Sequence, residues 1–456
     1  MSWTKQENYW SRPFDCHDEL FHVVRRMGAE INREHWQFMV NVKISFAAED
    51  DRIGSDIERR LRQAWKALRF LHPGIAVEVY ENEAQCREKK YHPVQTHQEL
   101  EDFCNETFFT ETTSSSADEF FSQRGRASRY ITLHWIPETR QIAFISSHAH
   151  WDGRGALFML HEYLSVLENP IIPTTLDGTE AENFVPSLNT VIGMPEKSKP
   201  EWEESAAEIM QHFMDVQPSI GCVPPGDTKS LPAESKRLET ILPPDMSKSL
   251  FQAARKENIT ISTAVETAGI LALTAMNNEG SQPEYYASWA AFDLRKYCPP
   301  PFDGPVHAPS IRLTSLPLIV KSQASWSEMS RAISELNRTP WDVNESDMMF
   351  VRDPFVRNAC GIFLAAMSQP DLPPSTEPFF SSLGVYEDYV KHEYGPFTVE
   401  DVSLAVHILP PSICLHIWTW RGSLHLSACY NTAYYTTDYV QDYLDTTKDI
   451  LLKNLL

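Results

Sequence analysis

Strand-like and helix-like segments alternate along the whole of this 456-residue chain. In the first half, the short apolar runs at 38–46 (FMVNVKISF) and 141–147 (QIAFISS) are typical of strands. The segment between them, at 55–71, keeps the apolar spacing of a helix, with Ser55 as a plausible N-cap. Three consecutive strands are predicted between 401 and 431. Mixed strands and helices in both halves fit α/β or α+β layers better than one barrel.

The same patterns predict the remaining elements. YITLHW and QIAFISS read as a hairpin joined by the turn IPETR. The helix that follows this hairpin is expected to run to about Leu167, where Asn169-Pro170 ends it. Further strands are predicted at 75–81, 285–294 and 310–320, and further helices at 202–215, 244–260, 262–276, 325–337 and 436–456.

The length of the chain favours two domains. Between about 170 and 235 prolines recur and charge runs such as EKSKPEWEESAAE appear, which is typical of a connection. We therefore predict an N-terminal subdomain at 1–185, a crossover or linker at 186–240 and a C-terminal subdomain at 241–456.

The charge balance limits the possible partners. The net charge is -22, with 40 basic and 62 acidic residues, whereas nucleic acids and anionic membranes are bound by Lys and Arg. No apolar run approaches the roughly 20 residues that cross a bilayer, and the polar start lacks a secretory signal. The eight cysteines show no CxxC spacing. We expect a cytoplasmic protein with reduced thiols and with neither nucleic acid nor membrane as a partner.

The run SHAHWDG at 147–153 lies between the strand QIAFISS and the next predicted helix. His148 is well placed there to act as a general base, because its imidazole is neutral near pH 7. Asp152 could fix the loop by bonding to backbone or pairing with an arginine. Gly153 permits a turn, and its N–H opens the helix.

Other interpretations of this run remain open. A His-x-x-x-Asp spacing arises by chance in a chain with 16 histidines. His148 and Asp152 could instead ligate a metal, but no further ligand cluster accompanies them, so we expect no metal. His150 and His161 are expected to be structural.

Several segments together resemble the CoA-dependent acyltransferase superfamily, which includes nonribosomal-peptide condensation domains, BAHD acyltransferases and chloramphenicol acetyltransferase. The resemblance covers most of the chain in the family's order, and it is nearest to fungal alcohol acetyltransferases of the trichothecene 15-O-acetyltransferase type. It rests on HxxxDG, LRQAWKALRFLHPGIAVEVYE, SKSLFQAARKENITISTAVETAGILALTA, WAAFDLRKYCPP, PFFSSLGVYEDYV and RGSLHLSACYNTAYY.

The resemblance implies an α/β (α+β) fold with two chloramphenicol-acetyltransferase-like subdomains, arranged as a V-shaped pseudo-dimer around a central tunnel. Acyl donor and acceptor would enter the tunnel from opposite faces. The family's pattern makes His148 the catalytic base, Asp152 its structural support and Gly153 the end of the motif. Arg295 matches the arginine that pairs with this aspartate. A bidentate arginine is also the partner that a buried carboxylate requires.

Two departures from the family pattern qualify the resemblance. Condensation domains usually carry two adjacent histidines, whereas here the first position is Ser147, which favours acetyltransferases over amide-forming condensation. The DFGWG motif of plant BAHD enzymes is absent, and SSLGVYEDY occupies the corresponding region. Trp151, Ser381 and Ser382 are therefore only candidate substrate-binding residues.

The implied activity is an enzymatic one. We expect a monomeric O-acyltransferase of fungal secondary metabolism, with acetyl-CoA or another acyl-CoA as co-substrate, no bound cofactor and a small-molecule hydroxyl as acceptor. One alternative is a condensation-like enzyme that takes its acyl group from a carrier protein, or one that catalyses a cyclisation or elimination without CoA. Another alternative is a catalytically silent binding protein on the same scaffold.

Overall fold

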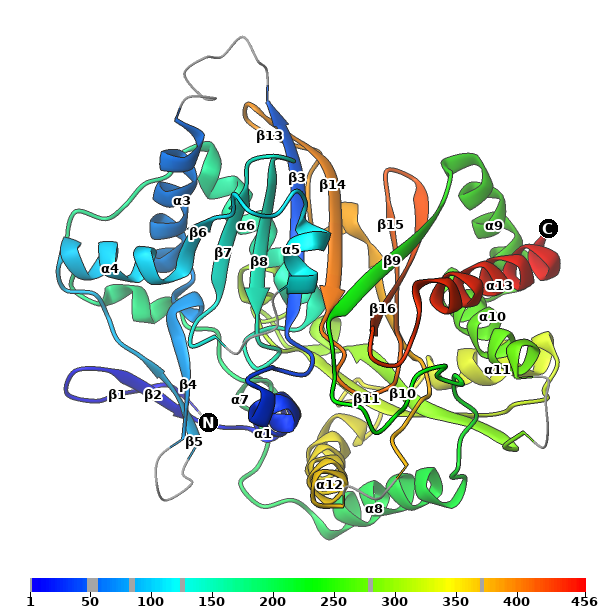
Figure 1. Ribbon diagram of the computed structural model, residues 1–456. Coiled ribbons are helices and arrows are strands. Elements are labelled where there is room, and N and C mark those ends of the chain that lie inside the picture. Colours follow the sequence, from blue (N-terminus) through cyan, green and yellow to red (C-terminus); the bar gives the residue numbers. More distant parts are fainter. Residues whose placement is uncertain (1, 47–55, 82–86, 124–127, 278–281, 370–372) are drawn as a thin grey trace. The chain divides into compact units, whose positions relative to one another are not determined.

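The computed structural model describes residues 2–46, 56–81, 87–123, 128–277, 282–369 and 373–456 (Figure 1). Their contacts divide the chain into two compact units. The first unit comprises 1–194, 298–312 and 387–405, and the second comprises 195–297, 313–386 and 406–456. The predicted subdomain boundaries at 185 and 240 remain a prediction. Two segments from later in the chain, 298–312 and 387–405, pack with the first unit.

A six-stranded sheet forms the centre of the first unit. The hairpin predicted before the HxxxDG motif is confirmed, since β7 and β8 pair antiparallel. The strand β14, predicted as one of three consecutive strands, lies instead beside β3 in this sheet, where Asn41 donates a hydrogen bond to Ser403. The strand order is β13 (Glu393–Tyr394), β14 (Phe397–Val406), β3 (Phe38–Phe46), β8 (Gln141–Ser146), β7 (Thr132–Ile136) and β6 (Phe108–Thr110).

A buried tryptophan joins the helices α3, α4 and α6 of the first unit to this sheet. Trp65 on α3 is fully buried, stacks on Phe103, and meets Phe144 of β8 and Tyr163 of α6 edge-on. Its indole N–H donates to the hydroxyl of Thr107 at 2.8 Å. This core fixes β8 and α6, the two elements that flank the motif. The helices are α1 (Cys16–Arg25), α3 (Ile57–Leu71), α4 (His97–Thr107), α5 (Ala117–Gln123), α6 (Gly153–Glu168) and α7 (Leu188–Val191).

A second, antiparallel sheet of the first unit uses residues near the N-terminus. Its order is β1 (Thr4–Lys5), β2 (Trp10–Pro13), β5 (Arg87–Tyr91) and β4 (Val77–Glu81). Of these strands, only β4 was predicted. The predicted N-cap Ser55 lies outside the described residues, and the described helix begins after Asp56.

The second unit contains two sheets. One has the order β12 (Phe379–Val385), β15 (Cys414–Trp420), β16 (Ser423–Asn431) and β9 (Ser235–Leu242), in which β12 runs parallel to β15. The other pairs β10 (Tyr285–Asp293) with β11 (Leu313–Lys321) antiparallel. The strands predicted at 285–294 and within 401–431 are confirmed, although they divide between sheets.

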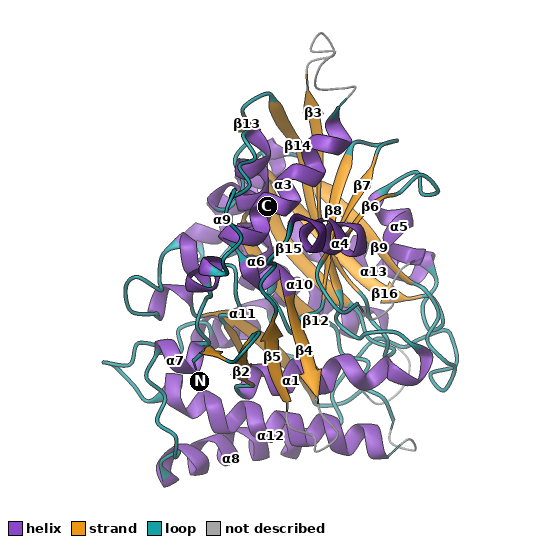
Figure 2. Ribbon diagram, turned by 90° about the vertical axis from the view of Figure 1, so that its left-hand side faces the viewer, coloured by secondary structure: helices purple, strands orange, loops and turns teal. Residues whose placement is uncertain are grey.

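The helices of the second unit include one that the sequence did not predict. This helix, α12, lies beside α8 in Figures 1 and 2. Trp202 of α8 stacks on Phe350 of α12 at 4.8 Å and donates to Asp347 at 2.8 Å. The predicted connection therefore carries a helix that packs within the second unit. The helices are α8 (Pro200–Asp215), α9 (Pro244–Lys256), α10 (Ile261–Met276), α11 (Trp326–Leu336), α12 (Met348–Ser368) and α13 (Thr437–Leu455).

The described helices differ from membrane spans in length or in composition. None of them alone is long and apolar enough to cross a bilayer. The pair α9 and α10 reaches that length and composition together, but the two helices are bent by 95° at their junction.

Candidate functional site

The SHAHWDG run forms a tight turn between β8, which ends at Ser146, and α6, which begins at Gly153. The backbone N–H of His150 donates to the Ser147 carbonyl at 3.1 Å, and the N–H of Ala149 donates to the Ser147 hydroxyl at 3.3 Å. The predicted strand–loop–helix setting is confirmed. The Ser147 backbone and side chain both hold the turn that carries His148.

Asp152 is the N-cap of α6 and is 2% exposed. One of its carboxylate oxygens accepts the Gly155 N–H at 2.7 Å, which satisfies a donor that the helix itself leaves unpaired. The other oxygen accepts the backbone N–H of Arg312 at 2.8 Å. The carboxylate therefore ties the start of α6 to a segment 160 residues further along the chain.

The segment 310–312 was predicted to begin a strand, and this prediction was wrong. The strand β11 begins at Leu313, because the Arg312 N–H is directed to Asp152 and not to a neighbouring strand. The Ser310 carbonyl also accepts the Asp152 N–H at 3.5 Å. Apolar alternation across 310–320 cannot distinguish strand pairing from pairing with a distant carboxylate.

His148 lies in an aromatic cradle of the first unit. Its ring stacks on Phe21 of α1 with centroids 4.1 Å apart and an interplanar angle of 13°. Phe38 meets the ring edge-on at 5.5 Å, and Trp36 lies 6.2 Å away. Nδ1 is buried and has no hydrogen-bond partner among the described residues, whereas the residue as a whole stays partly exposed. The exposed part of the residue is therefore made up of atoms other than Nδ1.

The cradle keeps His148 neutral. Burial lowers the pKa of His148 from 6.5 to about 4, because the charged imidazolium loses its water. The Asp152 carboxylate and a contact with the residue's own backbone oppose this shift. At neutral pH the imidazole is thus unprotonated, which is the form that accepts a proton.

A buried acid lies next to the turn. Glu34 is 1% exposed, and its Oε1 lies 3.3 Å from Nε of Arg25. Burial raises the pKa of Glu34, and both Arg25 and the Ser147 hydroxyl oppose that rise. The Glu34 carboxyl therefore lies close to the side chain of Ser147, the residue directly before His148.

His150 points into different surroundings. It lines a pocket together with Lys89 and Asp18, and it is 9% exposed. Burial and the nearby cations lower the pKa of His150 to about 3. His161 is hydrogen-bonded through Nδ1 to the Tyr394 hydroxyl at 2.7 Å, which agrees with the structural role expected for it.

The other predicted site residues occupy several places. Trp151 is 2% exposed and meets Phe144 edge-on at 6.3 Å. Ser381 and Ser382 lie on β12, and the Ser382 hydroxyl shares a hydrogen bond with Ser262 at 2.6 Å. Arg295 belongs to the second unit, where its guanidinium donates to Asp293 at 2.7 Å. Its predicted pairing with Asp152 remains a prediction.

One group among the described residues has the composition of a metal site. The ligand atoms of Asp15, Cys16 and His17 lie within 4.8 Å of one another. The Asp15 carboxylate, however, accepts the N–H groups of His17 and Asp18 as the cap of α1. We therefore assign this group to helix capping.

The thiols Cys104, Cys222 and Cys414 are free and buried. Burial raises the pKa of each, in the case of Cys222 to about 12, so none of the three is activated as a nucleophile. Cys86 lies outside the described residues.

Sequence reasoning missed the residues that surround His148. Phe21 lies on α1, which was not predicted, although its start carries a capping box in which Asp15 and Asp18 each bond to the backbone of the other. An acidic residue at the N-cap and another three positions later, before the apolar Leu20 and Phe21, is a recognisable helix start. The bond between Asp152 and Arg312 left no signal at Arg312, because on that side it uses only the backbone N–H.

The chain is similar over its full length to fungal acetyltransferases. It is 26% identical to the acetyltransferase pigO of Monascus ruber over 465 residues, which covers 100% of this chain and 98% of pigO. It is also 26% identical to the O-acetyltransferase pigM of the same organism, over 100% of this chain and 87% of pigM. The predicted resemblance to fungal acetyltransferases of the CoA-dependent acyltransferase superfamily agrees with these relatives. A scan against protein-family models gave no match.

Solved structures share the fold of this chain. The TRI3 trichothecene 15-O-acetyltransferase of Fusarium sporotrichioides matches with a TM-score of 0.83 at 18% identity, over 100% of this chain and 97% of TRI3. The first condensation domain of the calcium-dependent antibiotic synthetase matches with a TM-score of 0.64 at 11% identity, over 97% of this chain and 95% of that domain. The predicted α/β fold of the chloramphenicol-acetyltransferase type is confirmed, and the relatives support an acyltransferase of fungal secondary metabolism.

Proposed function

We propose that this chain is an O-acetyltransferase that moves an acetyl group from acetyl-CoA to a hydroxyl of a fungal secondary metabolite. The observation that carries the proposal is the neutral His148, held between β8 and α6 in a chain whose full-length relatives are acetyltransferases. A partly exposed imidazole that stays unprotonated at neutral pH is suited to removing a proton from an acceptor.

In the proposed mechanism His148 acts as a general base. Since Nδ1 is buried, Nε2 accepts the hydroxyl proton as the acceptor oxygen attacks the thioester carbonyl. The tetrahedral intermediate collapses, the carbon–sulfur bond breaks, and the thiolate takes the proton from His148. The products are the ester and CoA. The protein forms no acyl-enzyme in this route, in keeping with the inactive buried thiols.

The remaining motif residues have supporting roles in this proposal. Asp152 holds the turn through Gly155 and Arg312 and does not itself carry protons. Arg295 is proposed to pair with Asp152. Trp151, Ser381 and Ser382 are proposed to contact substrate. We further propose that the enzyme acts as a monomer in the cytoplasm.

Ser147 favours this activity over amide-forming condensation. Its hydroxyl accepts the Ala149 N–H, so it serves the turn where condensation domains usually have a histidine. A condensation-like reaction would take the acyl group from a carrier-protein thioester. An assay that compares acetyl-CoA with an acetylated carrier protein as the acyl donor distinguishes the two reactions.

The test is to incubate the protein with hydroxylated metabolites and one of three donors: acetyl-CoA, an acetylated carrier protein or acetyl pantetheine. Thiol release and the mass of the product are followed. We expect an acetyl ester with acetyl-CoA and much slower release with the other donors. His148→Ala should lower the rate by about 10²–10⁴-fold.

The matched control is His161→Gln, because His161 lies on α6 and bonds to Tyr394. This variant should retain the wild-type rate to within a few-fold. Equal rates for His148→Ala and the wild type would rule out the base assignment. Product from the carrier protein alone would support the condensation-like alternative.

A further inference from the structure

A pocket of about 70 Å³ lies within the first unit, on the side of the motif to which His150 belongs. Its walls include residues of β2, α1 and β5, the motif residues His150 and Trp151, and the segment 309–312. A pocket of this size has room for several waters or one small ligand. The proposed acyl transfer gives no role to its charged side chains, and of its lining residues it uses only Trp151, as a candidate substrate contact, and the backbone of Arg312.

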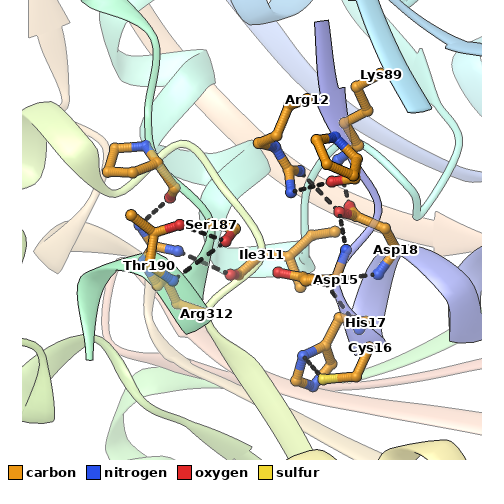
Figure 3. A network of polar contacts seen from close by, with 12 residues as sticks. Arg12, Asp15, Cys16, His17, Asp18, Lys89, Ser187, Thr190, Ile311 and Arg312 are labelled. Atoms are coloured by element: carbon orange, nitrogen blue, oxygen red, sulfur yellow. Dashed lines mark hydrogen bonds and ion pairs between the residues drawn. The ribbon is translucent and has the colours of Figure 1, made fainter. Parts of the chain in front are cut away.

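The charged groups that line this pocket carry a surplus of positive charge. Arg12, Lys89 and Arg312 are each less than a tenth exposed, and only two carboxylates, Asp15 and Asp18, line the pocket with them. Figure 3 shows Arg12 and Lys89 converging on Asp18, with Arg312 and Ser187 nearby.

Both carboxylates are already in use. Asp18 accepts from Arg12 at 2.8 Å and from Lys89 at 2.6 Å, while Asp15 caps α1. One carboxylate thus serves two buried cations. Buried cations of this kind are stable only when their charge is compensated.

His150 provides the second observation. Its ring lines the pocket and is 9% exposed, yet it has no hydrogen-bond partner among the described residues. Burial, followed by the nearby cations Lys89 and Arg25, lowers the pKa of His150, so the ring stays neutral and keeps one N–H to donate. A ring N–H that faces a pocket without a protein acceptor is satisfied there by a ligand or by water.

We propose that this pocket binds one small oxyanion of the phosphate type, held by Arg12 and Lys89 with a hydrogen bond from His150. The surplus of cations argues against a metal ion, and the lack of any spare carboxylate argues against an amine. The anion would bridge β2 and β5 to the motif, and so steady the turn that Asp152 ties to Arg312. The proposal does not depend on acyl transfer or on His148.

The test is calorimetric titration of the full chain with inorganic phosphate at constant ionic strength, with chloride as the reference salt. We expect saturable binding of one phosphate and a higher melting temperature in phosphate than in chloride. Lys89→Gln should weaken binding about tenfold or more, since it removes a charged donor. The matched control is Lys90→Gln, because Lys90 is the next residue on β5 and pairs with Glu88 at 3.1 Å.

Two further variants keep the test decisive if Lys89→Gln does not fold. Asp18→Asn removes a competing carboxylate and should tighten phosphate binding. Gly74→Met changes the pocket wall at a position where an added Cβ meets no atom within 4 Å, and should weaken binding. No saturable binding by the wild type, or binding that none of the pocket variants changes, would overturn the proposal.

The same titration identifies the source of the oxyanion. CoA and dephospho-CoA are added to the phosphate-loaded protein. Displacement by CoA alone assigns the anion to the 3′-phosphate of the nucleotide, and displacement by neither assigns it to free phosphate. Inactivity in the acetyl-transfer assay would leave the phosphate result unaffected, so the two proposals fail separately.

Discussion

The two histidines of the motif lie two residues apart, yet their surroundings differ in kind. His148 stacks on Phe21 in an aromatic cradle, whereas His150 faces buried cations and carboxylates. Burial lowers the pKa of both rings, to about 4 and about 3. Similar pKa values therefore arise from one apolar and one charged environment.

The difference lies in what the neutral ring can do. His148 stays partly exposed while its Nδ1 is buried, which is compatible with the base role proposed for it. His150 is buried and lines a polar pocket, where we propose that it holds a small oxyanion. A lowered pKa alone does not mark a catalytic histidine, and the exposed part of the ring has to be considered with it.

The largest expected effect comes from the residue that holds both sides of the turn. Asp152→Asn keeps an oxygen for the Gly155 N–H but places an amide N–H group opposite the Arg312 N–H. Because a charge-assisted bond is replaced by two opposed donors, we expect a loss of about 2–3 kcal/mol in the free energy of unfolding. Urea unfolding measures this loss, together with the yield of folded protein.

The control is Asp177→Asn, since the Asp177 side chain is exposed and accepts a local bond from Thr179. This variant should unfold at the wild-type urea concentration. If Asp152→Asn were as stable as the wild type and lost only turnover, the structural role of Asp152 would be wrong, and the carboxylate would have to act in the reaction.

The sequence predicted the strand before the motif and the helix after it, but not the residues that pack around His148. Strands β3, β7 and β8 and helices α3 and α6 follow clear apolar periodicities, and the structure confirms them. The family resemblance correctly indicated the fold. The helix α12 was missed because it is apolar on several sides and contains Pro354, which normally argues against a helix interior.

The pocket could not be predicted from the sequence for a different reason. Arg12, Lys89 and Arg312 are far apart in the chain, and each resembles an ordinary surface cation in its own segment. Only the pairing of β2 with β5 brings Arg12 opposite Lys89. Such a cluster depends on the register between strands that are far apart in the sequence, and no local sequence pattern predicts that register.

The second prediction concerns the His150 side and uses pH. The unfolded chain protonates this histidine below about pH 6.5, whereas the folded protein does not do so until about pH 3. The folded state therefore loses stability as the pH falls from 6.5 toward 3, by about 1.4 kcal/mol for each pH unit. His150→Gln should remove this contribution and so be less sensitive to acid.

The measurement is urea unfolding of the wild type and His150→Gln at pH 7.5 and pH 5.5. The difference in stability between the two pH values should be smaller for the variant by about 1 kcal/mol. His392→Gln serves as the control, because its side chain is 47% exposed and should keep the wild-type difference. An unchanged acid sensitivity of His150→Gln would mean that this ring is not held neutral by its pocket.

The smallest expected effect concerns the cradle of His148. Phe21→Leu removes the aromatic ring that stacks on the imidazole and lets water reach it. Because burial is weakened, the pKa of His148 should rise from about 4 toward 6.5. The base would then be partly protonated at pH 5.5. A full return to 6.5 would lower kcat/KM about tenfold between pH 7.5 and 5.5, so a partial return should lower it a few-fold.

The readout is the ratio of kcat/KM at pH 5.5 to that at pH 7.5, which a simple loss of stability would not shift in this way. The wild type should give a ratio close to one, because His148 stays neutral at both pH values. Phe46→Leu is the control, since Phe46 packs on Phe397 at the far end of β3. If Phe21→Leu kept the wild-type ratio while its rate fell equally at both pH values, Phe21 would position His148 without setting its pKa. His148 and His150 would then differ only in how far each residue is exposed to solvent.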